Sequence, residues 1–427
     1  MVSALPRATG QISHGTPGSR EPYGIIRCVS FASINRPNGP VTSGAIGPAD
    51  PAIASLPELH RVNDFCQAVL EPNANHVDRH GIDRGQLDEL ADTGIFRLPF
   101  PVELGGGGAD PGMIREATEL IAGACGTTWF CFAQHRSPTT ALLNSDNDAL
   151  RARWLAKMIS GQAIAGIAFA HLRRAQQAFW ISEQSDGWLL DGSLDWVTTW
   201  PLTDVVLVQG YLRDGQGQQR DEIISVLVEP PSVDMDIQDR TEIDGLTAGP
   251  ELALAAMSGT RTWPVRFDNY WVPASHFVSR QPAADWALAN SLVAADAKAA
   301  SFGIARSCIN ELASIATTSG QDSVQQATEA LRGEFESLRA TAYAAADAAA
   351  ADRDVAIATL DERTALRAQA LDLAGRASTA LIVASGGRAL TLTNDAQRHA
   401  REALFMMVQG QTPQLRSQTL GMLTSGT

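Results

Sequence analysis

The stretch DGWLLDGSLDWVTTWPLTDVVLVQGY, residues 186–211, decides the fold class of this chain. Short runs of β-branched and aromatic residues are separated in it by Asp-Gly and Pro-containing turns, a pattern typical of antiparallel strands. Similar short runs, with Gly-Gln-Gly and Pro-Pro turns between them, continue over about residues 163–275. We therefore expect a β-domain in the middle of the chain.

The chain on both sides of this β-domain has the periodicity of helices. Near residue 60, the apolar side chains Leu59, Val62, Phe65, Cys66 and Val69 recur at i, i+3 and i+4 spacing, which places them on one helical face. Helical sequence returns from Ala283 to about Gln409 and is rich in alanine, the strongest helix former. The fold class is thus mainly α with a central β-domain. We expect an N-terminal α-helical domain over residues 51–160, the middle β-domain over 161–278 and a helical C-terminal domain over 279–427.

Residues 1–50 differ in composition from the rest of the chain. They are rich in Gly, Pro and Ser and have no helical periodicity. They also lack the basic start and the apolar region of a secretory signal. We expect a poorly ordered extension here, with two alternatives: an arm that docks on a neighbouring molecule, or a start codon assigned too early.

Charge and cysteine content exclude several kinds of protein. The net charge of −14 and the pI near 5.0 argue against a non-specific nucleic-acid surface. No apolar run reaches the roughly 18 residues of a membrane span, so no membrane partner is expected. The five cysteines form no C-x-x-C pair. We therefore expect no metal site, and buried thiols in a reducing, cytoplasmic location.

Four segments, in this order, resemble the acyl-CoA dehydrogenase superfamily: LADTGIFRLPFPVELGGGGAD (90–110), the opening stretch (186–211), AASFGIARSCINELASIA (299–316) and ASGGRALTLTNDAQRHAREALFMMVQGQT (384–412). The resemblance implies an N-terminal α-bundle, a middle antiparallel β-barrel and a C-terminal four-helix bundle. It also implies a flavin, normally FAD, between the middle and C-terminal domains. The C-terminal bundle usually forms a homotetramer, and a homodimer is the alternative.

The segment DWVTTW offers what a flavin ring needs, namely an apolar wall and hydrogen-bonding groups. On an alternating strand, Trp196, Thr198 and Trp200 would share one face, with Val197 and Thr199 on the other. A strand with aromatic packing and no ligand is the plainer interpretation. The resemblance implies these cofactor-binding residues: Phe169, Ala170, Trp196, Thr198, Thr199, Gln409, Gly410, Gln411 and Thr412.

The sequence departs from the family at its catalytic base. In most members a glutamate precedes a Gly-Thr near the C-terminus, and here Gln409 precedes Gly410. An amide cannot accept the proton that such a glutamate removes. In a minority branch the glutamate lies on the first helix of the C-terminal domain, where Asn290 or a neighbour stands here. Asp285 and Asp296 are the nearest carboxylates to that position.

Two cofactor elements of the family also differ. The TExxxGSD loop reads FAHLRRAQQA here (169–178), and the Arg-x-x-Phe-Gly element that grips the FAD diphosphate is absent from ASIATTSGQDSVQQATEA. Both departures argue against tightly bound FAD. FMN, or a reduced flavin supplied by a separate reductase, is the alternative cofactor.

These departures favour an oxygen-activating flavoenzyme of monooxygenase or oxidase type, in a catabolic or secondary-metabolic pathway. Related two-component enzymes form a flavin C4a-peroxide with O2 and need a group to manage its proton. We expect His135 to be this catalytic group, since imidazole titrates near neutrality. A helix-end or surface histidine is the plainer interpretation. His171 is the second choice, with an ordinary loop histidine as its alternative.

Two other functions stay open. One is an acyl-CoA dehydrogenase or an oxygen-using enzyme for an unusual CoA thioester, with Asp296 or no protein group as the base. Arg173 and Arg174 could then contact phosphates, although a solvated basic pair is the plainer interpretation. The other is a catalytically silent homologue that binds a partner or an acyl group. The glycine-rich ELGGGGAD stretch is not a phosphate loop, because no Lys-Ser/Thr follows it, and we expect a flexible connection.

Overall fold

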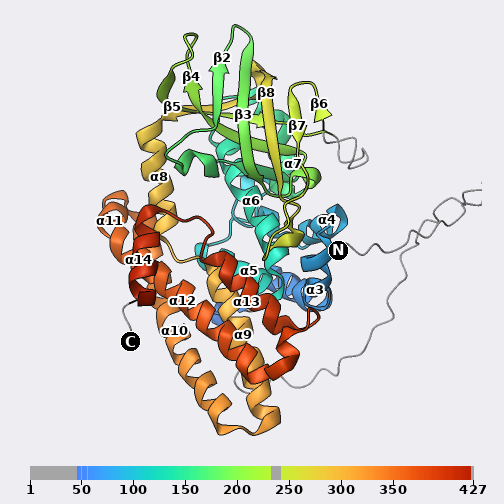
Figure 1. Ribbon diagram of the computed structural model, residues 1–427, viewed down its shortest axis with the longest axis vertical. Helices are drawn as coiled ribbons and strands as arrows, with labels where there is room; N and C mark the ends of the chain where they lie inside the picture. The colour runs from blue at the N-terminus through green and yellow to red at the C-terminus, as the bar shows by residue number, and fades with distance from the viewer. Residues whose placement is uncertain (1–45, 50, 55, 232–241, 425–427) are drawn as a thin grey trace, which may run out of the picture. The chain divides into compact units, whose positions relative to one another are not determined.

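The computed structural model of the chain describes residues 46–49, 51–54, 56–231 and 242–424 (Figure 1). These residues all belong to one compact unit, residues 43–427. Helices come first, strands follow, and a second set of helices ends the described chain. This mainly helical fold with a central sheet confirms the predicted fold class.

Most of the predicted extension, residues 1–50, lies outside the described residues. Its last part is nevertheless anchored. The Ile46 N–H donates to Asn310 Oδ1 at 2.8 Å, and Arg306 Nε donates to the Ile46 carbonyl at 3.0 Å. Ile46 is buried in the helical core, so here the expectation of a poorly ordered segment is wrong.

The N-terminal helices pack on α5 and α6. Asp83 caps α4 by accepting from the Gln86 N–H at 2.8 Å, and Asp110 caps α5 by accepting from the Met113 N–H at 2.9 Å. Gly94 follows α4 with φ of 86°, as expected of a glycine that ends a helix. These helices are α1 (Pro51–Ala54), α2 (Pro57–Phe65), η1 (Cys66–Leu70), α3 (Glu71–His80), α4 (Arg84–Asp92), α5 (Pro111–Ala124), α6 (Gly126–Leu143) and α7 (Asp148–Ser160).

The glycine-rich loop is not a loose connection. Gly107 N–H donates to the Arg97 carbonyl at 2.7 Å, and Gly108 N–H donates to the Phe100 carbonyl at 2.8 Å. A Cβ on Gly106 would lie 2.1 Å from the Phe100 carbonyl oxygen. The glycines are needed because the loop folds back tightly on residues 97–101, so the expected flexible connection is wrong.

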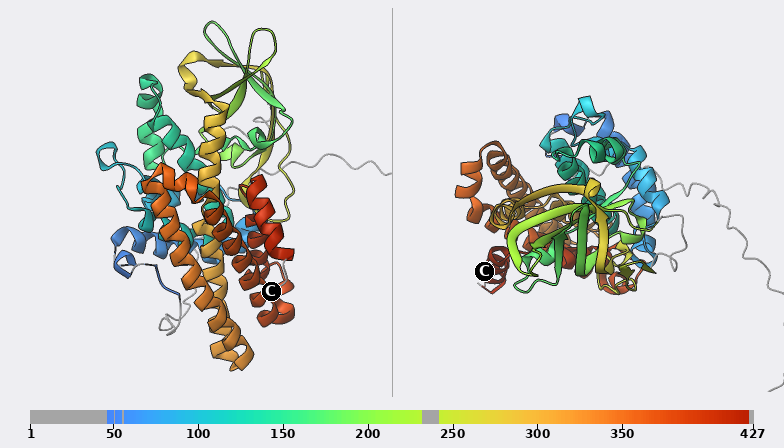
Figure 2. Two further views of the ribbon diagram at one scale, coloured as in Figure 1. Left: turned by 90° about the vertical axis from the view of Figure 1, so that its left-hand side faces the viewer. Right: turned by 90° about the horizontal axis from the view of Figure 1, so that it is seen from above.

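The strands form one nine-stranded sheet in the order β6-β7-β8-β3-β2-β4-β5-β9, with β1 paired to β4 (Figures 1 and 2). Most pairs are antiparallel, as predicted, but β4 runs parallel to both β1 and β2. The strands are β1 (Ala165–Ala168), β2 (Phe179–Glu183), β3 (Gly187–Val197), β4 (Val205–Arg213), β5 (Gln219–Val228), β6 (Glu242–Ile243), β7 (Leu246–Ala248), β8 (Trp263–Pro273) and β9 (Phe277–Pro282).

The C-terminal helices surround α9, and the long α10 lies along it (Figure 2). Glycines on α5 and α9 bring the two helical regions together, because a Cβ on Gly303 would lie 2.3 Å from the Glu119 carbonyl oxygen. The helices are α8 (Ala283–Ala295), α9 (Ala299–Ser319), α10 (Asp322–Ala351), α11 (Arg353–Ala358), α12 (Leu360–Ser385), η9 (Gly386–Leu390), α13 (Asp395–Met406) and α14 (Pro413–Thr424).

A break between α8 and α9 divides the start of the helical region that the sequence predicts from Ala283 onward. Residue 296 adopts extended dihedral angles, and three basic side chains bind the last carbonyls of α8. Arg363 donates to the Leu292 carbonyl at 3.1 Å, Lys298 to the Val293 carbonyl at 2.6 Å, and Arg367 to the Ala294 carbonyl. The helix therefore ends because side chains satisfy its terminal carbonyls.

No helix among the described residues is long and apolar enough to cross a membrane.

Candidate functional site

A cleft of about 710 Å³ lies between the sheet and the C-terminal helices; we call it the central cleft. Its walls come from five parts of the chain that are far apart in sequence. Phe130 and Gln134 come from α6, Phe169 from the segment after β1, and Trp196 from the end of β3. Residues 404–410 close the opposite side, and residues 254–256 complete the lining. Its size and mainly apolar lining are typical of small-molecule sites.

Six of the nine predicted cofactor-binding residues line this cleft: Phe169, Ala170, Trp196, Thr198, Gln409 and Gly410. The fold therefore brings together predicted residues that are separated by more than 200 positions in the sequence. Thr199, Gln411 and Thr412 are adjacent in sequence but do not line the cleft. Thr199 and Thr412 are buried, and Thr412 Oγ1 accepts from the Leu415 N–H at 3.2 Å near the start of α14.

The strand containing Trp196 does not alternate as expected. Strand β3 ends at Val197, and Thr199 has a φ of 65°, in the left-handed region. Trp196 is 49% exposed whereas Trp200 is 1% exposed, so the two indoles do not share a face. The turn at Thr199 reverses the chain and leaves Trp196 and Thr198 as the cleft residues of this segment.

A chain of hydroxyl groups supports Thr198. Thr198 Oγ1 lies 3.3 Å from Thr262 Oγ1, which lies 2.8 Å from Thr260 Oγ1, and Thr260 Oγ1 donates to the Met257 carbonyl at 2.7 Å. The Thr199 N–H donates to the Thr260 carbonyl at 3.0 Å, which fixes the turn. Since a hydroxyl oxygen can accept two hydrogen bonds, Thr198 Oγ1 can still accept one from a ligand in the cleft.

At the opposite edge of the cleft, two side-chain amide oxygens have no hydrogen-bond partner among the described residues. Gln409 Oε1 and Gln411 Oε1 are buried and have no hydrogen-bond donor among the described residues. The Gln411 side chain is held by its Nε2, which donates to the Met407 carbonyl at 2.5 Å. Gly410 has a φ of 61°, a conformation that glycine adopts without strain. Since Gln409 lines the cleft, its free carbonyl oxygen is available to a ligand N–H.

The residues that line the central cleft, all in the described part of the chain, include no carboxylate. Asp285 is exposed on α8, and Asp296 is paired with Arg363 at the break after α8. Neither is among the lining residues. The cleft as described therefore has no protein carboxylate to remove a proton from carbon.

His135 is buried next to the cleft and does not line it. Its Nδ1 accepts from the Ala165 N–H at 3.0 Å, and its Nε2 donates to the Met158 carbonyl at 2.8 Å. Burial lowers the pKa of His135 to about 4. With both ring nitrogens bound to backbone, this geometry does not favour the proton-handling role that the sequence suggests.

His171, the second choice, is held in a similar way. Its Nε2 donates to the Gln209 carbonyl at 2.8 Å, and its ring packs edge-on against Phe179. Burial lowers its pKa to about 4 as well. It is not among the residues that line the central cleft.

Arg173 and Arg174 are not a solvated pair. Arg174 forms an exposed ion pair with Asp195 at 2.5 Å. Arg173 lies over the Phe169 ring, 4.9 Å from its centroid, and lines the central cleft. The sequence contains no signal that separates these neighbours, and it also gives none for the facing of Phe130 or Phe405, which the structure places in the cleft wall.

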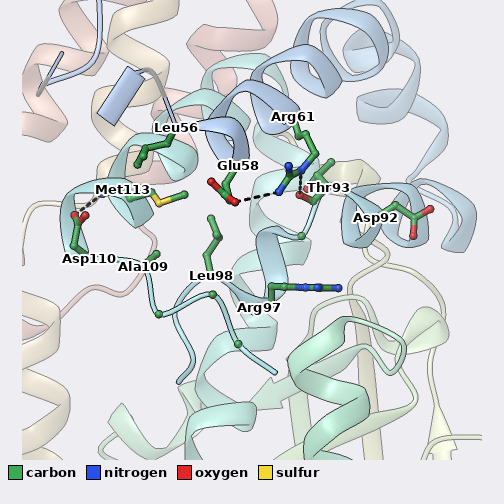
Figure 3. A pocket seen from close by; sticks show the side chains of 14 residues that line it. Leu56, Glu58, Arg61, Asp92, Thr93, Arg97, Leu98, Ala109, Asp110 and Met113 are labelled. Carbon is green, nitrogen blue, oxygen red and sulfur yellow. Dashed lines mark hydrogen bonds and ion pairs between the residues drawn. The ribbon is translucent and has the colours of Figure 1, made fainter. Parts of the chain in front are cut away.

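Two further cavities lie outside the central cleft. One, of about 240 Å³, is lined by His135, Lys298 and Arg136 and shares Ala133 with the central cleft. The other, of about 640 Å³, lies beside the glycine-rich loop (Figure 3). In the second cavity Glu58 and Arg61 pair at 3.5 Å, so part of its charge is already satisfied.

The described residues contain no group of three or more His, Cys, Asp or Glu side chains arranged to hold a metal ion. Their four cysteines, Cys66, Cys125, Cys131 and Cys308, are free and buried.

Comparison with known proteins gives one family match and many structural neighbours. Residues 59–162 match the family described as acyl-CoA dehydrogenase, N-terminal domain. The probable acyl-CoA dehydrogenase YngJ of Bacillus subtilis (strain 168) is 24% identical over 223 residues, which are 51% of this chain and 56% of the relative. The alignment thus spans about half the length of the curated relatives.

Solved structures match over most of the described chain. Butyryl-CoA dehydrogenase from Megasphaera elsdenii has a TM-score of 0.70 at 20% identity, covering 86% of this chain and 97% of that one. Dibenzothiophene monooxygenase TdsC from Paenibacillus sp. A11-2 has a TM-score of 0.70 at 16% identity, covering 86% and 96%. Since a dehydrogenase and a monooxygenase share this fold, the fold does not select the reaction.

Proposed function

Because the chain belongs to the acyl-CoA dehydrogenase superfamily, we propose that it is a flavin-dependent oxidoreductase whose flavin ring occupies the central cleft. The proposal rests on one observation: residues Trp196 and Thr198 and residues Gln409 and Gly410 line the same mainly apolar cleft. FAD is the cofactor we favour, and FMN is the alternative.

The residues present suit an isoalloxazine ring. Trp196 and Phe169 offer flat apolar surfaces, and the Thr198 hydroxyl lines the cleft as a polar group. The buried Oε1 of Gln409 has no donor, and a flavin ring carries an N–H that could supply one. We infer that these residues, with Ala170 and Gly410, would hold the ring.

We favour oxygen activation over dehydrogenation as the reaction. A reduced flavin supplies two electrons to O2, and this step needs no protein base at a carbon atom. Desaturation of a thioester needs a group that removes the α-proton, and no carboxylate lines the central cleft. A monooxygenase or oxidase also requires a site that limits contact between the ring and water, and the mainly apolar lining of the cleft suits this.

An acyl-CoA dehydrogenase reaction is the second candidate. It is supported by the relatives, since YngJ and the isovaleryl-CoA dehydrogenase of Pongo abelii are both named as dehydrogenases. Such a reaction would need a substrate whose α-hydrogen is acidic enough to leave without a carboxylate. A silent binding homologue is the third candidate.

We also infer that the chain forms a homotetramer or a homodimer through its C-terminal helices. Large apolar side chains are exposed there, and two of them, Leu404 and Val408, lie at the cleft itself. A second copy at α13 would cover these side chains and exclude water from the cleft. Light scattering at two protein concentrations tests this expectation.

The test is a comparison of two half-reactions. The purified chain is titrated with FAD in oxidised form and in photoreduced form without air, and the reduced complex is then mixed with O2 in a stopped-flow spectrometer. We expect binding of reduced FAD and an O2-dependent absorbance change, with no bleaching of oxidised FAD by acyl-CoA. Anaerobic bleaching by acyl-CoA would select the dehydrogenase. Failure to bind FAD in either form would reject both reactions.

A further inference from the structure

Arg173 is the only charged residue among those that line the central cleft in the described part of the chain. Its guanidinium forms one hydrogen bond, from Nη2 to Asn290 Oδ1 at 2.7 Å. The Nε atom is buried and has no acceptor among the described residues. No carboxylate of the described residues pairs with Arg173, whereas its neighbour Arg174 pairs with Asp195.

A desolvated guanidinium without an anion is costly, because burial removes water that no partner replaces. Burial lowers the pKa of Arg173, which agrees with that cost. A surface arginine could avoid it by turning to solvent, as Arg174 does with Asp195. Arg173 instead is held over the Phe169 ring and against α8 by Asn290.

Other basic side chains lie behind Arg173, of which Lys298 is only partly charged at neutral pH because burial lowers its pKa to about 7. Arg367 and Lys298 bind the last carbonyls of α8, and Arg367 also binds the Gln409 carbonyl at the cleft edge. Burial, and next the charge of Arg173, lower the pKa of Arg367 to about 10. Asp296 is the one acid in this group, and Arg363 pairs with it. This end of the cleft therefore has an excess of positive charge.

We propose that Arg173 binds an anionic group of the small molecule that enters the central cleft, so that the substrate is an apolar or aromatic carboxylate or sulfonate. The walls that meet Arg173 are aromatic: Phe169 under it, and Phe130 and Phe405 across the cleft. Such walls suit the body of the molecule, and the guanidinium suits its charged end, because arginine pairs with planar anions through two N–H groups.

This inference rests on the proposed function in one respect: it places the substrate beside the flavin ring. The anion could instead be a phosphate of the cofactor. We favour the substrate because Arg173 lines the same cleft as the residues assigned to the ring, and flavin phosphates are carried on the chain that leaves the ring.

The test uses two fluorescent probes of one skeleton, 8-anilinonaphthalene-1-sulfonate and the uncharged N-phenyl-1-naphthylamine. Both are titrated into the full-length protein and its Arg173→Gln, Arg173→Lys and Arg174→Gln variants. We expect Arg173→Gln to weaken binding of the sulfonate about tenfold or more, since a charge-assisted hydrogen bond is lost. The uncharged probe should bind within about twofold of wild type. Arg173→Lys should be intermediate, and Arg174→Gln should match wild type.

Three outcomes would overturn the assignment. Sulfonate binding could be unaffected by Arg173→Gln, or it could fall equally in Arg174→Gln. In the third outcome Arg173→Gln weakens the binding of FAD but changes neither the binding of the sulfonate nor that of lumiflavin, a flavin without a phosphate. Arg173 would then bind a phosphate of the cofactor and not the substrate. Absence of FAD binding, with the probe contrast intact, would reject the flavin proposal and leave the anion site standing.

Discussion

Arg367 donates a hydrogen bond from Nη2 to the backbone carbonyl of Gln409 at 2.6 Å. Its other terminal nitrogen donates to the Ala294 carbonyl at the end of α8. One buried side chain of α12 therefore ties the cleft edge to the break between α8 and α9. Within its own segment the edge is held by the Gln409 N–H, which donates to the Phe405 carbonyl at 3.0 Å, and Arg367 adds a tie to a distant helix.

We expect Arg367→Met to lower the free energy of unfolding by roughly 2–4 kcal/mol, because two backbone carbonyls lose a charged hydrogen-bond donor. FAD affinity should fall with it, since the edge of the cleft is released. Urea unfolding followed by circular dichroism measures the first effect. The matched control is Arg376→Met on the same helix, whose partners Glu334 and Asp372 lie at the surface. That change should cost less than about 1 kcal/mol, and equal losses in the two variants would contradict the role given to Arg367.

Thr198→Val tests the flavin wall. The substitution keeps the shape of the side chain and removes the hydroxyl group that lines the cleft. We expect FAD affinity to fall about three- to tenfold, the effect of one neutral hydrogen bond. Thr247→Val, at the exposed position of strand β7, is the control and should leave affinity unchanged. Unaltered FAD binding by Thr198→Val would mean that the hydroxyl does not face the ring.

Glu402→Gln tests the buried pair that holds the start of α6, the helix that supplies Phe130 to the cleft. The Glu402 carboxylate accepts from the Gly126 N–H at 2.9 Å and from Arg398 at 2.9 and 3.1 Å. The variant removes the buried one of the two carboxylates that pair with Arg398 and leaves only the half-exposed Asp395, at 3.1 Å. We expect it to lose roughly 3–5 kcal/mol of unfolding free energy.

The control is Glu311→Gln, since Glu311 is half-exposed and contacts the same histidine, His399, at 3.3 Å. It should cost less than about 1 kcal/mol. A second expectation concerns acid. Burial alone would raise the pKa of Glu402, but the charge of Arg398 outweighs burial and lowers this pKa to about 2. Its contribution is therefore complete above about pH 4.5 and is lost as the pH falls toward 2, so Glu402→Gln should flatten that part of the stability curve.

The sequence predicted the order of helices and strands, the helix end at Gly94 and the two sides of the cleft. These features depend on local periodicity or on glycine, which a single segment displays. The break after α8 could not be predicted, because the residues that cause it, Arg363 and Arg367, lie about 70 positions further along the chain. No glycine or proline marks it.

The facing of individual side chains was also beyond the sequence. Thr199 adopts a left-handed conformation that β-branched residues rarely take, so alternation failed where the strand ended. Arg173 and Arg174 are identical residues with opposite surroundings, one in the cleft and one at the surface. In both places tertiary contacts determine which way the side chain faces. The pattern of residue types along the sequence gives no information about these contacts.

The last prediction concerns His135 and the pH dependence of stability. Its pKa is about 4 in the folded protein and near 6.5 when exposed, so the unfolded chain binds the proton more readily. The stabilisation is present above pH 6.5 and is lost as the pH falls toward 4. Linkage gives a loss of about 1.3 kcal/mol between pH 7.5 and 5.5 from this residue. In His135→Gln the unfolding free energy should not show this loss between the two pH values. The control variant His60→Gln, at an exposed histidine, should show the same loss as wild type.

The same variants decide whether His135 handles protons in the reaction. We expect His135→Gln to be less stable at pH 8, because the Met158 carbonyl and the Ala165 N–H lose their shared partner. Once folded and loaded with FAD, it should react with O2 at a rate close to that of wild type. A rate at least about tenfold lower, with FAD affinity unchanged, would restore the catalytic role. An imidazole pKa near 6.5, measured for His135 by NMR, would contradict the buried neutral ring from which both expectations follow.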